Sequence, residues 1–190
     1  MRVITGSAKG KKLLAPTGMD TRPITDRIKE ALFNVLSYDI QDAGFLDLFA
    51  GSGSVGIEAL SRGASRVVFV EKSSKVVKII QDNLHNCHFD SDYQVYCLDV
   101  FRAIQDLHRK GERFDYIYVD PPFTNEAIFI EFMKAIDQVD LLSDDGMLII
   151  RARRKKEMPE ALTTIERIKT KDYGESTLHY YRLYEGVQEK

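Results

Sequence analysis

From residue 45 onward, short apolar runs alternate with amphipathic runs, and this alternation constrains the fold more than any other feature. Apolar, β-branched or aromatic runs that predict strands cover residues 45–49, 66–71, 94–98, 114–119 and 146–151. Runs with helical periodicity lie between them, at residues 54–62, 74–86, 100–109 and 125–138. This pattern predicts a doubly wound, Rossmann-like α/β fold, in which a mostly parallel sheet carries helices on both faces.

Both ends of the chain depart from the alternation. Near the N-terminus, "RVIT" (2–5) and "KLLA" (12–15) predict a small β-hairpin, and residues 25–37 predict a helix with Ile28, Leu32 and Val35 on one face. Near the C-terminus, two β-rich runs flank "GES" and predict an antiparallel hairpin. We therefore divide the chain into an N-terminal extension, residues 1–44, and a sheet domain, residues 45–190.

Charge distinguishes the two parts, although the net charge of the whole chain is only -2. Residues 1–30 contain seven Lys or Arg residues and three acidic residues. A basic extension on an acidic body suits an anionic partner such as nucleic acid, and a solvated basic hairpin is an equally good interpretation of charge alone.

Several classes of protein are excluded by what the sequence lacks. No apolar run approaches the ~18 residues that a membrane span needs, and the first residues do not resemble a signal peptide. Cys87 and Cys97 form no CxxC pair, and "HNCH" (85–88) has no second ligand cluster to complete a metal site. The sequence predicts a cytoplasmic protein without a metal or a membrane partner.

The segment "DLFAGSGSVGIEAL" (47–60) joins a strand, a glycine-rich turn and a helix. Gly51, Gly53 and Gly56 match G-x-G-x-x-G, in which glycines allow a tight turn and a close approach of a ligand to the backbone. Glu71 ends the next predicted strand 20 residues after Gly51, where a carboxylate binds the ribose of a dinucleotide. An NAD(P)-dependent oxidoreductase therefore stays open at this point.

The acid that precedes the turn favours a different ligand. Asp47 would repel the pyrophosphate of a dinucleotide, whereas S-adenosylmethionine has no phosphate and carries ammonium and sulfonium charges. Asp99 ends the third predicted strand, where it can accept a hydrogen bond from an adenine amino group. One such acid is most simply a loop residue or a helix cap. Three acids at successive strand ends, with Glu71 between these two, favour S-adenosylmethionine.

The fourth predicted strand ends in Asp120, Pro121, Pro122 and Phe123. The carboxylate and the Pro121 carbonyl can accept both hydrogens of an exocyclic amine, which frees the nitrogen lone pair for methylation. Prolines fix these acceptors before the substrate binds, and the ring offers a surface on which a base can stack. The tetrapeptide predicts methyl transfer to a planar amino group.

Five segments together resemble the RsmD family, the bacterial 16S rRNA guanine-N2 methyltransferases. They are "RVITGSAKGKKL" (2–13), "RPITDRIKEALFNVL" (22–36), "DLFAGSGSVGIEALSRGA" (47–64), "VDPPF" (119–123) and "YRLYE" (181–185). The resemblance covers nearly the whole chain, and the second segment is its most family-specific part. It implies a class I methyltransferase fold, S-adenosylmethionine as methyl donor, and a guanine N2 in 16S rRNA, within a small-subunit ribosomal particle, as acceptor.

These arguments give three sets of candidate residues. The catalytic set is Asp120, Pro121, Pro122 and Phe123. The cofactor-binding set is Asp47, Phe49, Gly51, Ser52, Gly53, Glu71, Lys72, Asp99, Val100 and Asp120. The RNA-binding set is Arg2, Lys9, Lys11, Lys12, Arg22 and Arg27. "RARRKK" (151–156) is a second RNA contact or, by a slight preference, a solvated helix start.

Three alternatives stay open from the sequence. An oxidoreductase would use the same glycines but leaves Asp47 and the tetrapeptide unexplained. A non-enzymatic RNA-binding protein on a methyltransferase scaffold would not need the tetrapeptide. Methylation of adenine N6 in DNA or another RNA would keep the same chemistry, because the motif does not distinguish the two bases.

Overall fold

The structure is a computed structural model and describes residues 1–16 and 24–184. The helices are α1 (Asp26–Leu36), the 3-10 helix η1 (Ser37–Ile40), α2 (Ser54–Ser61), α3 (Ser74–Asn86), α4 (Val100–Arg109) and α5 (Ala127–Ile136). The strands are β1 (Gly44–Leu48), β2 (Arg66–Glu71), β3 (Tyr93–Cys97), β4 (Phe114–Val119), β5 (Leu142–Arg153), β6 (Ile165–Tyr173) and β7 (Ser176–Leu183).

One seven-stranded sheet has the order β3-β2-β1-β4-β5-β7-β6. Strands β3, β2, β1, β4 and β5 are parallel, and β7 pairs antiparallel to both β5 and β6. The predicted fold class, including the C-terminal antiparallel hairpin, is confirmed. In sheets of this kind the ligand-binding crevice is expected outside the carboxyl ends of the strands at the point where the strand order reverses, which here lies between β1 and β4.

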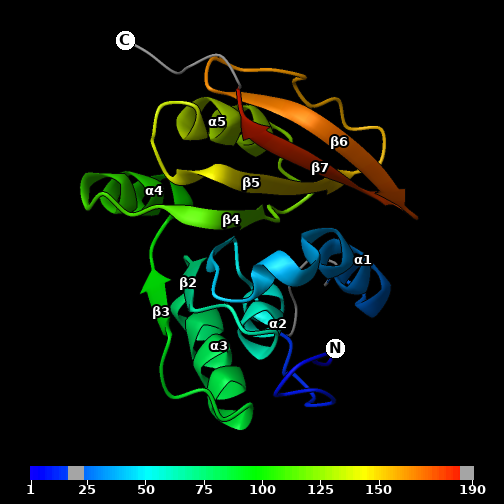
Figure 1. The fold of residues 1–190 in the computed structure, drawn as a ribbon, viewed down its shortest axis with the longest axis vertical. Coiled ribbons are helices and arrows are strands. Elements are labelled where there is room, and N and C mark those ends of the chain that lie inside the picture. The colour runs from blue at the N-terminus through cyan, green and yellow to red at the C-terminus, as the bar shows by residue number, and fades with distance from the viewer. Residues whose placement is uncertain (17–23, 185–190) are drawn as a thin grey trace.

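Helices cover both faces of the sheet (Figure 1). One core contains buried residues of α1, α2 and α3, and the other contains buried residues of α4 and α5. Val3 and Leu13 of the N-terminal segment are buried in the first of these cores, beside Ile80 and Leu84 of α3. The extension therefore shares its core with the sheet domain.

The predicted N-terminal hairpin is reduced to a single bridge between Arg2 and Lys12. Val3 N–H donates across the hairpin to the Lys11 carbonyl at 3.0 Å, and Leu13 N–H donates to the Met1 carbonyl at 3.1 Å, but the next donors along the chain turn toward α2. The N–H groups of Ile4 and Thr5 donate to the Glu58 carboxylate at 2.8 and 3.0 Å, and Ser7 N–H donates to the Ser61 carbonyl at 2.8 Å. A carboxylate is a stronger acceptor than a peptide carbonyl, which explains why the ladder stops.

Strand β5 continues to Arg153, beyond the predicted end at residue 151. The interpretation of residues 151–156 as a helix start is therefore wrong. Arg151, Ala152 and Arg153 pair with Leu178, Thr177 and Ser176 of β7, so the second strand of the C-terminal hairpin holds this segment extended.

Candidate active site

The glycine turn connects β1 to α2 and is fixed from below by two carboxylates. Gly51 N–H donates to Glu71 Oε2 at 3.2 Å, and Gly56 N–H donates to Asp47 Oδ2 at 2.9 Å. Gly53 has a φ of 75° and precedes the first residue of α2, so the turn requires a left-handed residue there. A Cβ at position 56 would lie 2.3 Å from the Phe69 ring, so only glycine lets α2 pack this closely on the sheet.

Three carboxylates come close together around this turn. Asp47 is 2% exposed, and burial raises the pKa of its carboxyl well above the ordinary value, with Asp120 and Glu71 raising it further. The crevice between β1 and β4 is thus rich in acidic groups. This environment suits a cationic ligand and disfavours a pyrophosphate. The glycine turn above it leaves room for a ligand close to the backbone, so the residues present fit S-adenosylmethionine.

The other predicted cofactor-binding residues lie along the same edge. Glu71 also accepts a hydrogen bond from Ser73 N–H at 2.9 Å, so it shapes the loop after β2. Asp99 is exposed and caps α4 by accepting from Phe101 N–H at 2.9 Å. The list is completed by half-buried Phe49 and buried Ser52 in the turn, exposed Lys72 after β2, and buried Val100 at the start of α4. Their contacts with the cofactor stay predictions.

Asp120 follows β4 on the other side of the crevice. Its carboxylate Oδ2 accepts from Arg151 Nη1 at 2.8 Å and from the Tyr118 hydroxyl at 3.3 Å. Burial raises the pKa of the Asp120 carboxyl, and the Arg151 guanidinium opposes that rise. Within the described part of the chain, no hydrogen bond engages Oδ1. One oxygen is therefore held by the protein while the other is available to a ligand.

The rest of the tetrapeptide forms a short loop. Pro121 is buried, Pro122 is half-buried, and the Pro122 carbonyl accepts from Asn125 N–H at 3.2 Å. The half-buried Phe123 ring has the Arg151 guanidinium 5.1 Å from its centroid. Arg151 thus contacts the first and the last residue of the tetrapeptide. The acceptor role of the Pro121 carbonyl stays a prediction.

Arg151 is the residue of the candidate site that the sequence analysis did not include. It is 3% exposed, and its Nε donates to Ser176 Oγ on β7 at 3.2 Å. In the sequence it reads as the first residue of a basic run. The sequence feature that could have identified it is its position directly after the apolar run "MLII" (147–150). That position places it at the carboxyl end of a strand, as Asp120 is.

The predicted RNA-binding residues do not gather at one place. Arg2 is exposed and pairs with Asp26 at 3.0 Å, and Arg27 is exposed on α1. Lys9, Lys11 and Lys12 are also exposed, on the tip of the N-terminal segment. Arg22 lies outside the described residues.

That tip lies at the amino edge of the sheet. Ser7 contacts the last residue of α2, and Lys11 Nζ lies 3.1 Å from Nε2 of His88, two residues past α3. Helices α2 and α3 begin at the carboxyl edge and run back across the sheet, so their ends are remote from the tetrapeptide. Lys29, which also adds to the basic charge of the extension, is fully buried against Glu58 at 3.2 Å.

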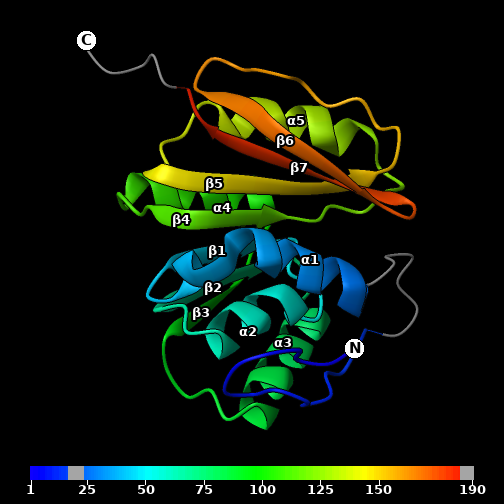
Figure 2. The same ribbon diagram turned by 45° about the vertical axis from the view of Figure 1, so that its right-hand side comes forward.

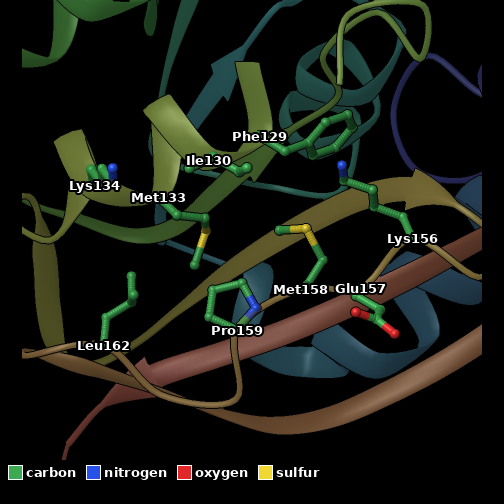
Figure 3. A pocket seen from close by; sticks show the side chains of 9 residues that line it. All are labelled: Phe129, Ile130, Met133, Lys134, Lys156, Glu157, Met158, Pro159 and Leu162. Carbon is green, nitrogen blue, oxygen red and sulfur yellow. The ribbon is translucent and has the colours of Figure 1, made fainter. Parts of the chain in front are cut away.

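An apolar hollow of about 190 Å³ lies elsewhere, between α5 and the chain after β5 (Figure 3). It contains no residue of the predicted catalytic or cofactor-binding sets. Its apolar lining includes Phe129, Ile130, Met133, Met158, Pro159 and Leu162. The candidate active site is therefore the acidic crevice, not this hollow.

Residues 1–16 and 24–184, which the structure describes, lack two further features. No helix there is both long and apolar enough to cross a membrane. No cluster of three or more His, Cys, Asp or Glu side chains in this part of the chain could hold a metal ion.

Comparison with known proteins identifies the family. The model of the family described as Conserved hypothetical protein 95 matches residues 1–182. The chain belongs to this family. It is the RsmD family of the sequence resemblance, which is thereby confirmed.

Individual relatives match this chain over nearly its whole length. YlbH of Bacillus subtilis is 35% identical over 182 residues, which cover 96% of this chain and 98% of that protein. Ribosomal RNA small subunit methyltransferase D of Escherichia coli is 31% identical, covering 97% of this chain and 89% of that protein. The solved structure of yhhF from Escherichia coli superposes with a TM-score of 0.82 at 31% identity, covering 96% of this chain and 97% of that one.

Membership of the RsmD family indicates the class of reaction. The chain is a methyltransferase, and the predicted cofactor, S-adenosylmethionine, is confirmed. The oxidoreductase alternative is not supported, because the glycine turn that it shares belongs here to a methyltransferase.

Proposed function

We propose that this protein methylates the exocyclic N2 of a guanine in 16S rRNA, within a small-subunit ribosomal particle in the cytoplasm. The observation that carries the proposal is the pairing of Asp120 with Arg151 beside the Phe123 ring, at the crevice between β1 and β4. The RsmD relative from Escherichia coli, which is named as a small-subunit rRNA methyltransferase, supports the choice of RNA.

The chain supplies an acceptor and a position for the amine. Arg151 stabilises the ionised form of Asp120 and occupies its Oδ2, so Oδ1 is left to accept a hydrogen from the guanine amine. The Pro121 carbonyl accepts the second hydrogen, and the nitrogen lone pair turns toward the glycine-turn side of the crevice. S-adenosylmethionine, when bound there, supplies the methyl group.

Asp120 acts as a positioning acceptor and not as a strong base. The nitrogen becomes cationic as the methyl group is transferred, and an ionised carboxylate beside it stabilises that charge. The cationic amine then loses its proton readily. Phe123 has Arg151 against its ring, and a free ring face would stack on the flipped guanine, which stabilises binding by about 1–3 kcal/mol per base.

The three acids at the strand ends can be assigned to parts of S-adenosylmethionine. We assign Glu71 to the ribose hydroxyls and Asp99 to the adenine amino group. Asp47 supports the turn from beneath through Gly56, and the positive ammonium and sulfonium of the cofactor, when bound, would favour the ionised form of its buried carboxyl. These assignments rest on the positions of the three acids at the ends of neighbouring parallel strands.

Mass mapping of 16S rRNA from cells with and without this protein tests the proposal. We expect one guanine to lose a methyl group in the cells that lack the protein. Purified protein and labelled S-adenosylmethionine should restore the modification on undermethylated small subunits, and nucleoside digestion should give N2-methylguanosine. Recovery of N6-methyladenosine instead would contradict the assignment of the base.

A further inference from the structure

The end of β5 projects past the catalytic loop. The last residue pair between the parallel strands β4 and β5 is Val119 with Ile150, after which β4 gives way to the tetrapeptide. Strand β5 continues to Arg153 and then turns. The residues after Ile150 therefore stand at the carboxyl edge of the sheet, level with the loop that contains Asp120.

We call residues Arg153, Arg154, Lys155 and Lys156 the basic turn. Lys156 N–H donates to the Arg153 carbonyl at 2.9 Å, and Arg154 N–H donates to the Glu175 carbonyl at 2.7 Å, so the turn has a defined backbone. Its side chains line a groove of about 450 Å³ together with Glu126 and Glu157. The groove thus has four basic side chains against two acidic ones.

Two members of the basic turn are held by the protein. Lys156 is 14% exposed, pairs with Glu126 at 2.8 Å and lies 5.5 Å from the Phe129 ring centroid, toward which its amine points in Figure 3. Arg154 pairs with Asp172 of β6 at 3.2 Å. These contacts fix the turn against the loop after the tetrapeptide and against the C-terminal hairpin.

Arg153 and Lys155 differ from these two. Both side chains are exposed, and neither forms an ion pair with any residue that the structure describes. Their charges are therefore available to a ligand at the edge where methylation takes place. Exposed arginine and lysine side chains that have no ion-pair partner, on a fixed turn, are suited to phosphate groups.

We propose that the basic turn binds the phosphate backbone of the substrate RNA beside the nucleotide that is methylated. This inference rests on the proposed function. A base that is flipped into the crevice stays attached to its backbone, so the flanking phosphates must pass close to Asp120 and Phe123. Arg153 and Lys155 are placed to bind them there.

The tip of the N-terminal segment is less suited to this role. Helix α3 starts at the carboxyl edge and has 13 residues, so its far end and the neighbouring Lys11 lie about 20 Å from that edge. Figures 1 and 2 show the N-terminal segment beside α2 and α3, on the opposite side of the molecule from β6 and β7. RNA bound only at the tip would not hold the target nucleotide.

The test compares double variants that each remove two positive charges. Arg153→Gln with Lys155→Gln changes the basic turn. The matched control, Lys78→Gln with Lys110→Gln, changes exposed residues of α3 and of the end of α4, neither of which forms an ion pair within the described residues. A third arm, Lys9→Gln with Lys12→Gln, changes the tip. The readouts are affinity for a 16S rRNA fragment from 50 to 300 mM salt, KM and kcat for small subunits, and cofactor affinity by calorimetry.

Each phosphate contact contributes about 0.7–0.9 to the slope of log affinity against log salt. We expect the basic-turn variant to lose about 1.4–1.8 of this slope and about 25–60-fold in RNA affinity at 0.1 M salt. Its KM should rise, while its kcat and cofactor affinity stay close to those of the wild type. The control should keep the wild-type slope.

An unchanged slope in the basic-turn variant would overturn this proposal, and so would an equal loss in the control. A slope that falls only in the tip variant would place the RNA at the amino edge and would also overturn it. In each of these cases the proposed function survives as long as the wild type methylates 16S rRNA. Absence of methylation by the wild type would instead refute the proposed function.

Discussion

Replacement of Arg151 by glutamine is the sharpest test of the catalytic geometry. The side chain of Arg151 is 4% exposed and that of Asp120 is 19% exposed, and the two are joined at 2.8 Å. Glutamine keeps a polar group of moderate size but removes the charge. A hydrogen bond to a charged group stabilises by about 1.5–3 kcal/mol, which corresponds to a loss of about 10- to 150-fold in turnover at neutral pH.

The variant should also change the pH dependence of turnover. Methyl transfer needs the ionised carboxylate, so the rate is high above the pKa of Asp120 and is lost as the pH falls through it. Burial raises this pKa, and Arg151 opposes the rise. Without the guanidinium the pKa moves further up, and the acid limb of the profile should move to higher pH. The Tyr118 hydroxyl and the neighbouring Asp47 remain in both proteins.

The assay is single-turnover methylation of undermethylated small subunits across the pH range, with calorimetry of cofactor binding as a check on folding. Arg151→Lys keeps the charge and should recover part of the rate with a smaller shift of the acid limb. If Arg151→Gln has the wild-type profile at a lower rate, Arg151 does not act through the ionisation of Asp120. The mechanism would then have to be revised.

Substitutions at four further positions test other parts of the site and fold. Asp120→Asn should lower kcat by about 10²–10³ with cofactor affinity unchanged, and near-normal single-turnover rates would refute the role of the carboxylate. Phe123→Ala should raise KM for small subunits through a stacking loss of about 1–3 kcal/mol, whereas Phe123→Tyr should be tolerated, as steady-state kinetics can show. Glu71→Ala should weaken S-adenosylmethionine binding by about 10- to 100-fold in calorimetry, and an unchanged affinity would remove it from the site. Lys29→Ala removes the 3.2 Å partner of the buried Glu58 carboxylate and leaves only Arg62, at 2.8 Å, as its ion-pair partner, so it should lower the free energy of unfolding by about 3 kcal/mol in urea titrations.

The local sequence pattern was sufficient to predict the fold because the strands are short and strongly apolar. Predicted strands at 45–49 and 66–71 correspond to β1 and β2, with shifts of at most one residue at either end. Such runs are buried on both faces of a parallel sheet, so their period and composition identify them without tertiary information. The strand-end acids and the glycine turn could be located for the same reason, since they follow directly from where the strands end.

Charged residues inside the fold could not be interpreted in this way. The sequence shows Arg151 as part of a basic run, but its partner Asp120 is 31 residues away and comes beside it only when β4 and β5 pair. Lys29 looks like part of a basic surface, yet its amine is fully buried against Glu58. Burial of a charge depends on a partner from another element, and neither periodicity nor local composition specifies that partner.

The Lys29–Glu58 pair also explains how the N-terminal segment supports the cofactor site. Lys29 Nζ donates to the Arg2 carbonyl at 2.7 Å and to Ser54 Oγ at 3.2 Å, and Ser54 is the first residue of α2 after the glycine turn. Glu58, one turn further along α2, accepts from the N–H groups of Ile4 and Thr5. Burial lowers the pKa of Lys29, and the attraction of Glu58 opposes that change, so the buried amine depends on Glu58 for its charge in the folded protein. The segment therefore holds the first turn of α2, and the glycine turn before it, in the position that a ligand would need.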